Sequence, residues 1–236
     1  MLADYNRRKE EGDMQFIRRH WYSLGLGFAV IAVVWSFLGD LRTVQVILLL
    51  NFAVLPLHQF EEYAWPGGEP WIINEVMMPK GDRPDRYPLN QNNAFFMNVP
   101  LAWSFYLIPV FFPDVVWLGL APVLFGFGQF FAHGMANNRK LRSLYNPGLA
   151  AVVFGHIPLG IWYLVEVYSK GMITLWDWVF AVAYIVIFIG IGMKKIGYGI
   201  LADKNSLYPF APEEMERFDR RGHLARIENA ANAKQV

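Results

Sequence analysis

Six long apolar runs constrain the fold of this chain more than any other feature of its sequence. A helix needs roughly 20 apolar residues to cross a bilayer, and six runs come near that length: 21–39, 44–64, 94–112, 115–136, 148–168 and 174–199. Only 17% of the 236 residues are charged, whereas a soluble domain usually carries about 25%. We therefore predict an all-α, polytopic membrane protein, with six transmembrane helices bundled into a single domain over residues 1–200.

The basic residues predict the orientation of this bundle. If each of the six runs crosses the membrane in turn, 19 of the 21 Lys and Arg residues fall on one side of the membrane. Only Arg42 and Lys170 fall on the other. The positive-inside rule places the richer side in the cytoplasm. Both termini are then cytoplasmic, residues 1–20 form an N-terminal tail and residues 201–236 a C-terminal one. The expected location is a bacterial-type inner (plasma) membrane.

The longest connection, residues 66–93, lies on the same side as the termini. Its five prolines exclude a long regular element. Apolar residues within it, among them Trp71 and Ile72, suit the membrane interface. We predict an ordered cover over the cytoplasmic end of the bundle.

The second run carries three ionisable residues near its end, His58, Glu61 and Glu62. Spacings of three and four residues place them on one helical face, about one turn apart. An ionisable group at membrane depth costs about 2.5–3.5 kcal/mol on insertion scales, so it is rare without a partner or a task. One imidazole and two carboxylates are also donor types that bind divalent metals. This triplet is therefore predicted to be functional.

Two other runs carry polar side chains at a similar depth. Gln129, His133 and Asn137 follow at intervals of four residues and share one helical face. His156 lies about 13 Å along the fifth run, at 1.5 Å per residue. Each could alone serve in interhelical hydrogen bonding. Together with His58, however, they place three histidines in one layer, which favours a shared site.

The chain contains no cysteine, which excludes thiolate ligands, a cysteine nucleophile and disulfides. Its basic residues follow the topology and do not form a basic face of the kind that binds nucleic acid. The expected partners are the lipid bilayer and a hydrophobic small molecule or lipid as substrate. The sequence does not indicate an oligomeric state.

The segment from His58 to Tyr63, HQFEEY, resembles the signature of the HXXEE family of integral membrane proteins. The resemblance continues through residues 133–137 and the Tyr-Asn-Pro-Gly segment 145–148, and it covers residues 45–200. Members of this family are suspected to be enzymes, with no settled reaction. The resemblance implies functional roles for the following residues: His58, Glu61, Glu62, His133 and Asn137.

We therefore expect a metal-dependent membrane enzyme. The expected ligands of a divalent metal, zinc or iron, are His58, Glu61 and His133, with His156 as a fourth. Glu62 and Asn137 are the expected catalytic residues, Glu62 as general base or outer partner of the ligands. The alternatives are a metal-free acid–base isomerase of an isoprenoid or sterol-like lipid, a proton- or cation-coupled transporter, and a structural role.

Overall fold

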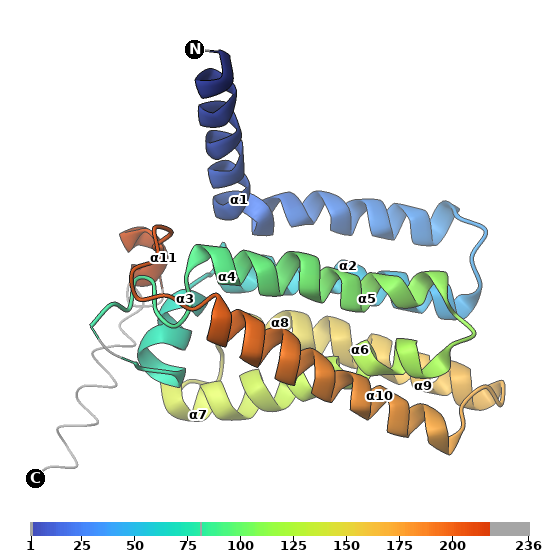
Figure 1. Ribbon diagram of the computed structural model, residues 1–236. Coiled ribbons are helices and arrows are strands. Elements are labelled where there is room, and N and C mark those ends of the chain that lie inside the picture. The colour runs from blue at the N-terminus through green and yellow to red at the C-terminus, as the bar shows by residue number, and fades with distance from the viewer. Residues whose placement is uncertain (1, 81, 218–236) are drawn as a thin grey trace, which may run out of the picture.

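The computed structural model describes residues 2–80 and 82–217, with side chains described from Met14 onward. Every regular element in these residues is helical. Six helical stretches in this part of the chain are long and apolar enough to cross a membrane. We number them spans 1 to 6: Met14–Leu38, Thr43–Tyr63, Gln91–Phe111, Val116–Leu141, Leu149–Ser169 and Leu175–Ile200. The predicted six-helix membrane bundle is confirmed (Figure 1).

The spans follow the predicted runs closely, with two extensions. Span 1 begins at Met14 instead of 21, and span 4 ends at Leu141 instead of 136. Both extensions add polar residues, because a helix can continue past the point where its apolar run stops. Asn137 thus lies within span 4.

Most spans consist of successive helical segments. Span 1 is the later part of α1 (Leu2–Leu38), and span 2 is α2 (Thr43–Tyr63). The other spans are composed as follows: α4 (Gln91–Phe96), η2 (Met97–Leu101) and α5 (Ala102–Phe111) in span 3; α6 (Val116–Gln129), η3 (Phe130–Asn137) and α7 (Asn138–Leu141) in span 4; α8 (Leu149–Ala151), η4 (Val152–His156) and α9 (Ile157–Ser169) in span 5; α10 (Leu175–Ile187) and η5 (Phe188–Ile200) in span 6. The η segments are π-helical, a geometry that often marks functional sites.

The second span, α2, is the central helix of the bundle. It packs against α1, α5 and α9, and 61% of its most apolar window is buried, more than in any other span. This position suits its sequence, because α2 carries buried polar and ionisable side chains, among them Asn51, His58 and Glu62, which would be costly against lipid. Large apolar side chains on the other spans face outward, including Phe37, Phe154 and Val165. Such faces suit a lipid surrounding.

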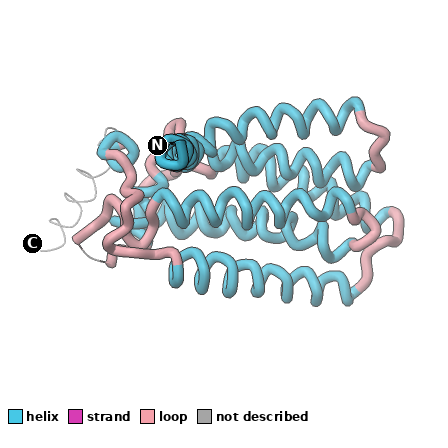
Figure 2. Tube along the Cα trace, turned by 45° about the horizontal axis from the view of Figure 1, so that its top comes forward, coloured by secondary structure: helices cyan, strands magenta, loops and turns pink. Residues whose placement is uncertain are grey.

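The connections between spans gather at the two ends of the bundle (Figure 2). We call one end the cap end, formed by residues 66–90, 142–148 and 201–217, and the other the far end, formed by residues 39–42, 112–115 and 170–174. The part of α1 that precedes span 1 projects away from the bundle at the cap end (Figure 1). At the far end, Arg42 and Asp114 form an exposed ion pair of 2.8 Å that joins two turns.

The connection 66–90 forms an ordered cover at the cap end. It contains one short helical stretch, α3 (Glu69–Trp71) followed by η1 (Ile72–Met77). The buried side chain of Asn74 holds the rest of the loop: its amide donates to the carbonyls of Pro84 and Leu89, and its carbonyl accepts from the amide of Leu89. The loop is therefore ordered, as expected, and Lys140 of α7 attaches it to span 4 by donating to the carbonyls of Val76 and Met77.

The residues after span 6 return to the same end. The amide of Gln91 donates to the carbonyl of Tyr208, and the amide of Phe210 donates to that of Asp85. After α11 (Pro212–Glu216), the guanidinium of Arg217 donates to the carbonyls of Tyr63 and Ala64, at the end of α2. The rest of the predicted C-terminal tail lies outside the described residues.

Candidate metal centre

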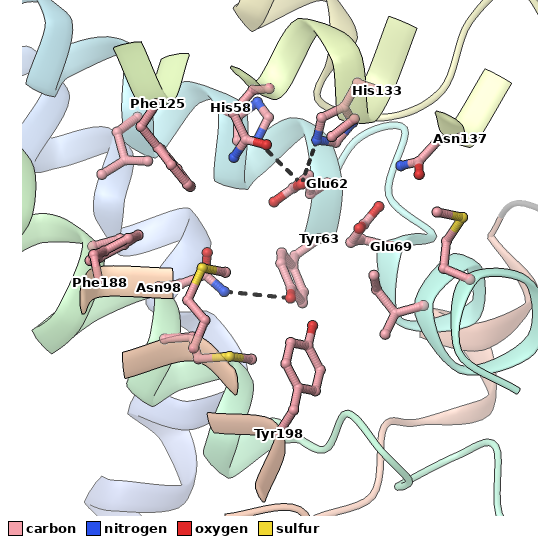
Figure 3. Close-up of a pocket in the computed structure, with 18 residues that line it drawn as sticks. His58, Glu62, Tyr63, Glu69, Asn98, Phe125, His133, Asn137, Phe188 and Tyr198 are labelled. Carbon is pink, nitrogen blue, oxygen red and sulfur yellow. Dashed lines mark hydrogen bonds and ion pairs between the residues drawn. The ribbon is translucent and has the colours of Figure 1, made fainter. Parts of the chain in front are cut away.

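Three buried side chains from two spans converge near the cap end of the bundle. On α2, His58 and Glu62 lie one turn apart, with Nε2 of His58 3.2 Å from Oε1 of Glu62. His133, on η3, directs its Nε2 to within 3.4 Å of the same oxygen. One donor atom from each residue lies within 4.8 Å of the others, so the group could hold a metal ion. Figure 3 shows both rings above Glu62.

Hydrogen bonds on the outer side of both rings determine which nitrogen is free. Nδ1 of His58 lies 3.0 Å from the carbonyl oxygen of Gly148, and Nδ1 of His133 lies 2.7 Å from Oδ1 of Asn146. The Asn146 amide is itself oriented, because its Nδ2 donates to the carbonyl of His133 and to Oδ1 of Asn138. Carbonyl oxygens only accept hydrogen bonds, so each Nδ1 carries the proton. Each Nε2 then presents a lone pair toward Glu62, the arrangement usual for metal-ligating histidines.

The turn that supplies these acceptors requires glycine at position 148. Gly148 has φ +94°, in the left-handed region that favours glycine. A Cβ there would lie 2.7 Å from Cε1 of His58 and 2.8 Å from Cε1 of His133. The Asn-Pro-Gly turn thus approaches both rings as closely as a backbone can.

Glu61 lies outside this group of three. Its carboxylate accepts from the hydroxyl of Tyr145 at 2.6 Å and from the backbone amides of Ala150 and Ala151 at 3.1 and 2.9 Å. These amides belong to the first turn of span 5, where the unpaired N–H groups and the helix dipole favour an anion. Both oxygens of Glu61 are thus used to join α2 to span 5. The contacts favour Glu62 over Glu61 as the carboxylate ligand.

His156 is buried near the group but does not join it. Its ring centroid lies 6.0 Å from that of His58, and its Nδ1 lies 2.7 Å from Oδ1 of Asn51. Its Nε2 is buried and has no hydrogen-bond partner among the described residues, as is also true of the nearby Tyr106 hydroxyl. His156 therefore shares the predicted layer, but it extends a neighbouring polar cluster rather than supplying a fourth ligand.

A cavity of 260 Å³ opens beside the group of three. Asn137 lines it and is buried. Apolar side chains form much of the remaining wall: Leu55, Met97, Ala102, Phe125, Phe188 and Met193. A cavity with apolar walls and a few converging polar groups is the usual form of a small-molecule site.

Glu69 is the main residue of this cavity that sequence reasoning missed. It lies on α3, in the cover, and faces the space below Glu62 (Figure 3). Its Oε2 is buried and has no hydrogen-bond partner among the described residues. Burial, together with the negative charge of Glu62, raises the pKa of the Glu69 carboxyl well above its ordinary value. The sequence offered one signal that could have pointed to Glu69. It is a single acid directly before an apolar stretch, Pro70 to Ile73, in a loop expected to be ordered.

Two tyrosines complete the polar side of the cavity, Tyr63 on α2 and Tyr198 on η5. The amide of Asn98 lies 3.5 Å from the Tyr63 hydroxyl. Tyr198 belongs to the last span, and no spacing rule connects it with the HXXEE segment. Only the folded bundle places these groups together.

Fold and site together define a six-span membrane protein with a buried His58–Glu62–His133 group able to hold a metal ion. Residues 49–163 match the model of a family described as a protein of unknown function with HXXEE motif, which confirms the resemblance over this part of the chain. All the site residues predicted from sequence lie within the matched segment. Neither a curated protein nor a solved structure matches the chain.

Proposed function

We propose that this protein is an integral membrane enzyme that depends on a divalent metal and acts on a lipidic or other hydrophobic substrate. One observation carries the proposal: Nε2 of His58 and Nε2 of His133 lie 3.2 and 3.4 Å from the same oxygen of Glu62, and all three residues are buried. One donor atom from each residue lies within 4.8 Å of the others.

The donor set fits a metal because the three atoms facing one another all carry lone pairs. Two Nε2 atoms whose partner nitrogens hold the protons cannot donate to a carboxylate. Buried groups of this kind need a cation between them, either a metal ion or an added proton. Two imidazoles and one carboxylate with room for a further ligand suit zinc or non-haem iron.

The metal would supply one of two kinds of chemistry. Zinc in such a set activates water for hydrolysis, and iron in such a set activates oxygen. The residues around it have distinct tasks. Asn146 and Gly148 hold the two rings in position. The raised pKa of the Glu69 carboxyl favours its protonated form, which can donate a hydrogen bond or a proton into the cavity.

The walls of the cavity support a hydrophobic substrate that enters from the side. In the far half of the bundle α6 packs closely against α10. Toward the cap end the continuations of these helices, η3 and η5, diverge (Figure 1). The cavity lies between them, with Phe125 and Ala132 on one side and Phe188 and Met193 on the other. A chain in the bilayer could pass between η3 and η5 to reach Glu62.

We place the cap end, and with it the site, on the cytoplasmic side of a bacterial-type inner membrane. The support is the distribution of charge in the sequence, since 19 of the 21 basic residues fall on the side of the membrane to which the predicted topology assigns the 66–93 connection.

A second candidate is metal-free acid–base catalysis on an isoprenoid or sterol-like lipid. The distances of 3.2 and 3.4 Å from the two Nε2 atoms to Glu62 are also compatible with a shared proton. In that case His58 and Glu62 would act as the acid–base pair.

Elemental analysis of purified protein by plasma mass spectrometry separates the two candidates. We expect about one zinc or iron per chain, lost in His58→Ala and in Glu62→Gln and kept in His20→Ala, which changes an exposed histidine. Circular dichroism and size-exclusion chromatography would check that the variants remain folded. Metal-free protein after reconstitution with zinc and with iron would overturn the metal proposal and favour the acid–base candidate.

A further inference from the structure

A second hollow lies on the outer face of span 4 at the cap end, away from the catalytic cavity. We call it the 134–144 pocket, because it is lined by residues between Gly134 and Leu144, and its volume is 390 Å³. Arg139 and Arg142 contribute the only ionisable side chains of its lining. The pocket therefore has a net positive charge with no acid to balance it.

The two arginines have no partner in the part of the chain that the structure describes. Their guanidinium groups form no hydrogen bond or ion pair with any residue that the structure describes. Neighbouring Lys140, by contrast, donates to the carbonyls of Val76 and Met77 and so is used by the cover. Two unpaired guanidinium groups beside one hollow are a strong attraction for an anion, and Arg matches phosphate especially well.

The shape of the pocket is set by the backbone conformation at the end of span 4. Arg142 takes the left-handed conformation, with φ +50°, which ends α7 and reverses the chain. The Asn138 side chain then donates to the carbonyl of Leu144 at 3.0 Å, which holds the segment after Arg142 against α7. The result is a pocket closed on one side by α7 and on the other by residues 143–144.

Depth and apolar rim point to a lipid as the occupant. Span 4 contains 26 residues, about 39 Å at 1.5 Å per residue, whereas the hydrocarbon core is about 30 Å thick. Its last turn, α7, therefore reaches the head-group layer. Two apolar side chains of the pocket face outward, Met135 at 56% and Leu144 at 96% exposure. They can contact acyl chains while the arginines hold the head group.

We propose that the 134–144 pocket binds the phosphate of an anionic phospholipid. The guanidinium groups of Arg139 and Arg142 contact the phosphate, and Leu144 and Met135 contact the upper part of the acyl chains. This arrangement is typical of basic pockets at the end of transmembrane helices. It is separate from the proposed metal centre and does not depend on a bound metal.

The test is a lipid titration of the full chain in neutral detergent, followed by native mass spectrometry. The probes are dioleoyl phosphatidylglycerol and dioleoyl phosphatidylcholine. The pocket variant is Arg139→Gln with Arg142→Asn, because Asn tolerates the left-handed backbone at 142. The control is Lys194→Gln with Lys195→Gln, which removes two exposed charges from η5 outside the pocket. Asn138 is left intact because it also bonds Asn146, which orients His133.

We expect the pocket variant to bind phosphatidylglycerol about 30-fold more weakly, from about fivefold for each basic residue near an anionic group. Binding of phosphatidylcholine, whose phosphate is balanced by its own choline, should weaken much less. The lysine control should lose less than about threefold, because Lys194 and Lys195 do not line the pocket. If the double variant is unstable by circular dichroism, Arg139→Gln alone should lose about fivefold. Adding Leu144→Ser to the arginine variant should weaken phosphatidylglycerol binding further without changing the charge of the pocket.

Three results would overturn the proposal. One is an equal loss in the arginine and lysine variants, which would mean a general attraction to charge. Another is unchanged binding in the pocket variant. The third is displacement of phosphatidylglycerol by inorganic phosphate at equal concentration, which would assign the pocket to a soluble anion.

Discussion

Nε2 of His133, on span 4, lies 3.4 Å from Oε1 of Glu62, on span 2. The same oxygen lies 3.2 Å from Nε2 of His58. Glu62 thus joins a histidine of its own helix to one of a distant helix, and the site exists only when these two spans pack together.

The two adjacent glutamates should respond differently to the same change. Glu62→Gln should lose the metal and leave the bundle folded, since Glu62 makes its polar contacts with the two histidines. Glu61→Gln should keep the metal but lower the free energy of unfolding by about 1–3 kcal/mol, because a buried charged acceptor of two backbone amides is lost. Metal analysis and thermal unfolding in detergent give the two readouts. Loss of metal in Glu61→Gln with retention in Glu62→Gln would reverse our assignment.

Gly148→Ala should disrupt the centre, because the added Cβ would lie within 2.8 Å of both histidine rings at a backbone conformation that alanine avoids. We expect loss of metal and a lower melting temperature. Gly190→Ala is the matched control, since a Cβ at that position meets nothing within 4 Å. Equal effects of the two substitutions would show that the turn at 148 has no special relation to the site.

Asn146→Ala removes the acceptor that holds Nδ1 of His133. Metal affinity should fall about 10- to 100-fold, the usual effect of removing an outer partner of a histidine ligand. Competition with a chelator of known affinity measures this change. An unchanged affinity would mean that His133 is not a ligand or does not need this bond.

The raised pKa of Glu69 predicts a pH dependence of stability. The folded protein keeps this carboxyl protonated over a pH range in which the unfolded chain has already released the proton. Stability therefore falls as pH rises from the ordinary value of 4.5 up through the raised pKa. Glu69→Gln, which cannot ionise, should remove this loss, so the variant should gain stability relative to the natural protein as pH rises. Parallel pH series of thermal unfolding would test it, and identical curves would contradict a buried, protonated Glu69.

A bulky side chain at position 132 should close the cavity without removing the metal. Ala132 lines the cavity beside His133, whereas Ala136, one turn later, is exposed. In cobalt-substituted protein, an alkyl hydroxamate should alter the visible spectrum. Ala132→Trp should prevent this change while keeping the cobalt spectrum, and Ala136→Trp should leave it intact. A hydroxamate response that survives in Ala132→Trp would exclude this route to the centre.

Much of the architecture could be read from the sequence. Six apolar runs near 20 residues predict six spans, because a bilayer demands that length and demands that helices satisfy their own backbone hydrogen bonds. The spacing of His58 and Glu62 likewise predicts one helical face, because helix geometry is local. The cover over residues 66–93 follows from its prolines and apolar residues.

The roles within the site depended on contacts that no local rule contains. Glu61 and Glu62 both lie about one helical turn from His58, three and four residues away. The first turn of span 5 decided between them, because the amides of Ala150 and Ala151 bind the carboxylate of Glu61 and leave Glu62 to face the histidines. Depth arithmetic brought His156 to the correct layer but could not give the direction of its ring, which Asn51 orients.

The sequence by itself thus determined the number of spans, their approximate bounds and the helix that carries the motif, because these depend on hydrophobic length and helical periodicity. The tertiary structure alone decided that Glu62 joins His58 and His133, that Glu61 binds a helix start, and that Glu69 enters the cavity from the cover. The physical reason is that local helix geometry fixes the direction of a side chain around the helix axis. The partner of that side chain depends on which neighbouring helix or loop packs against the same face of the helix.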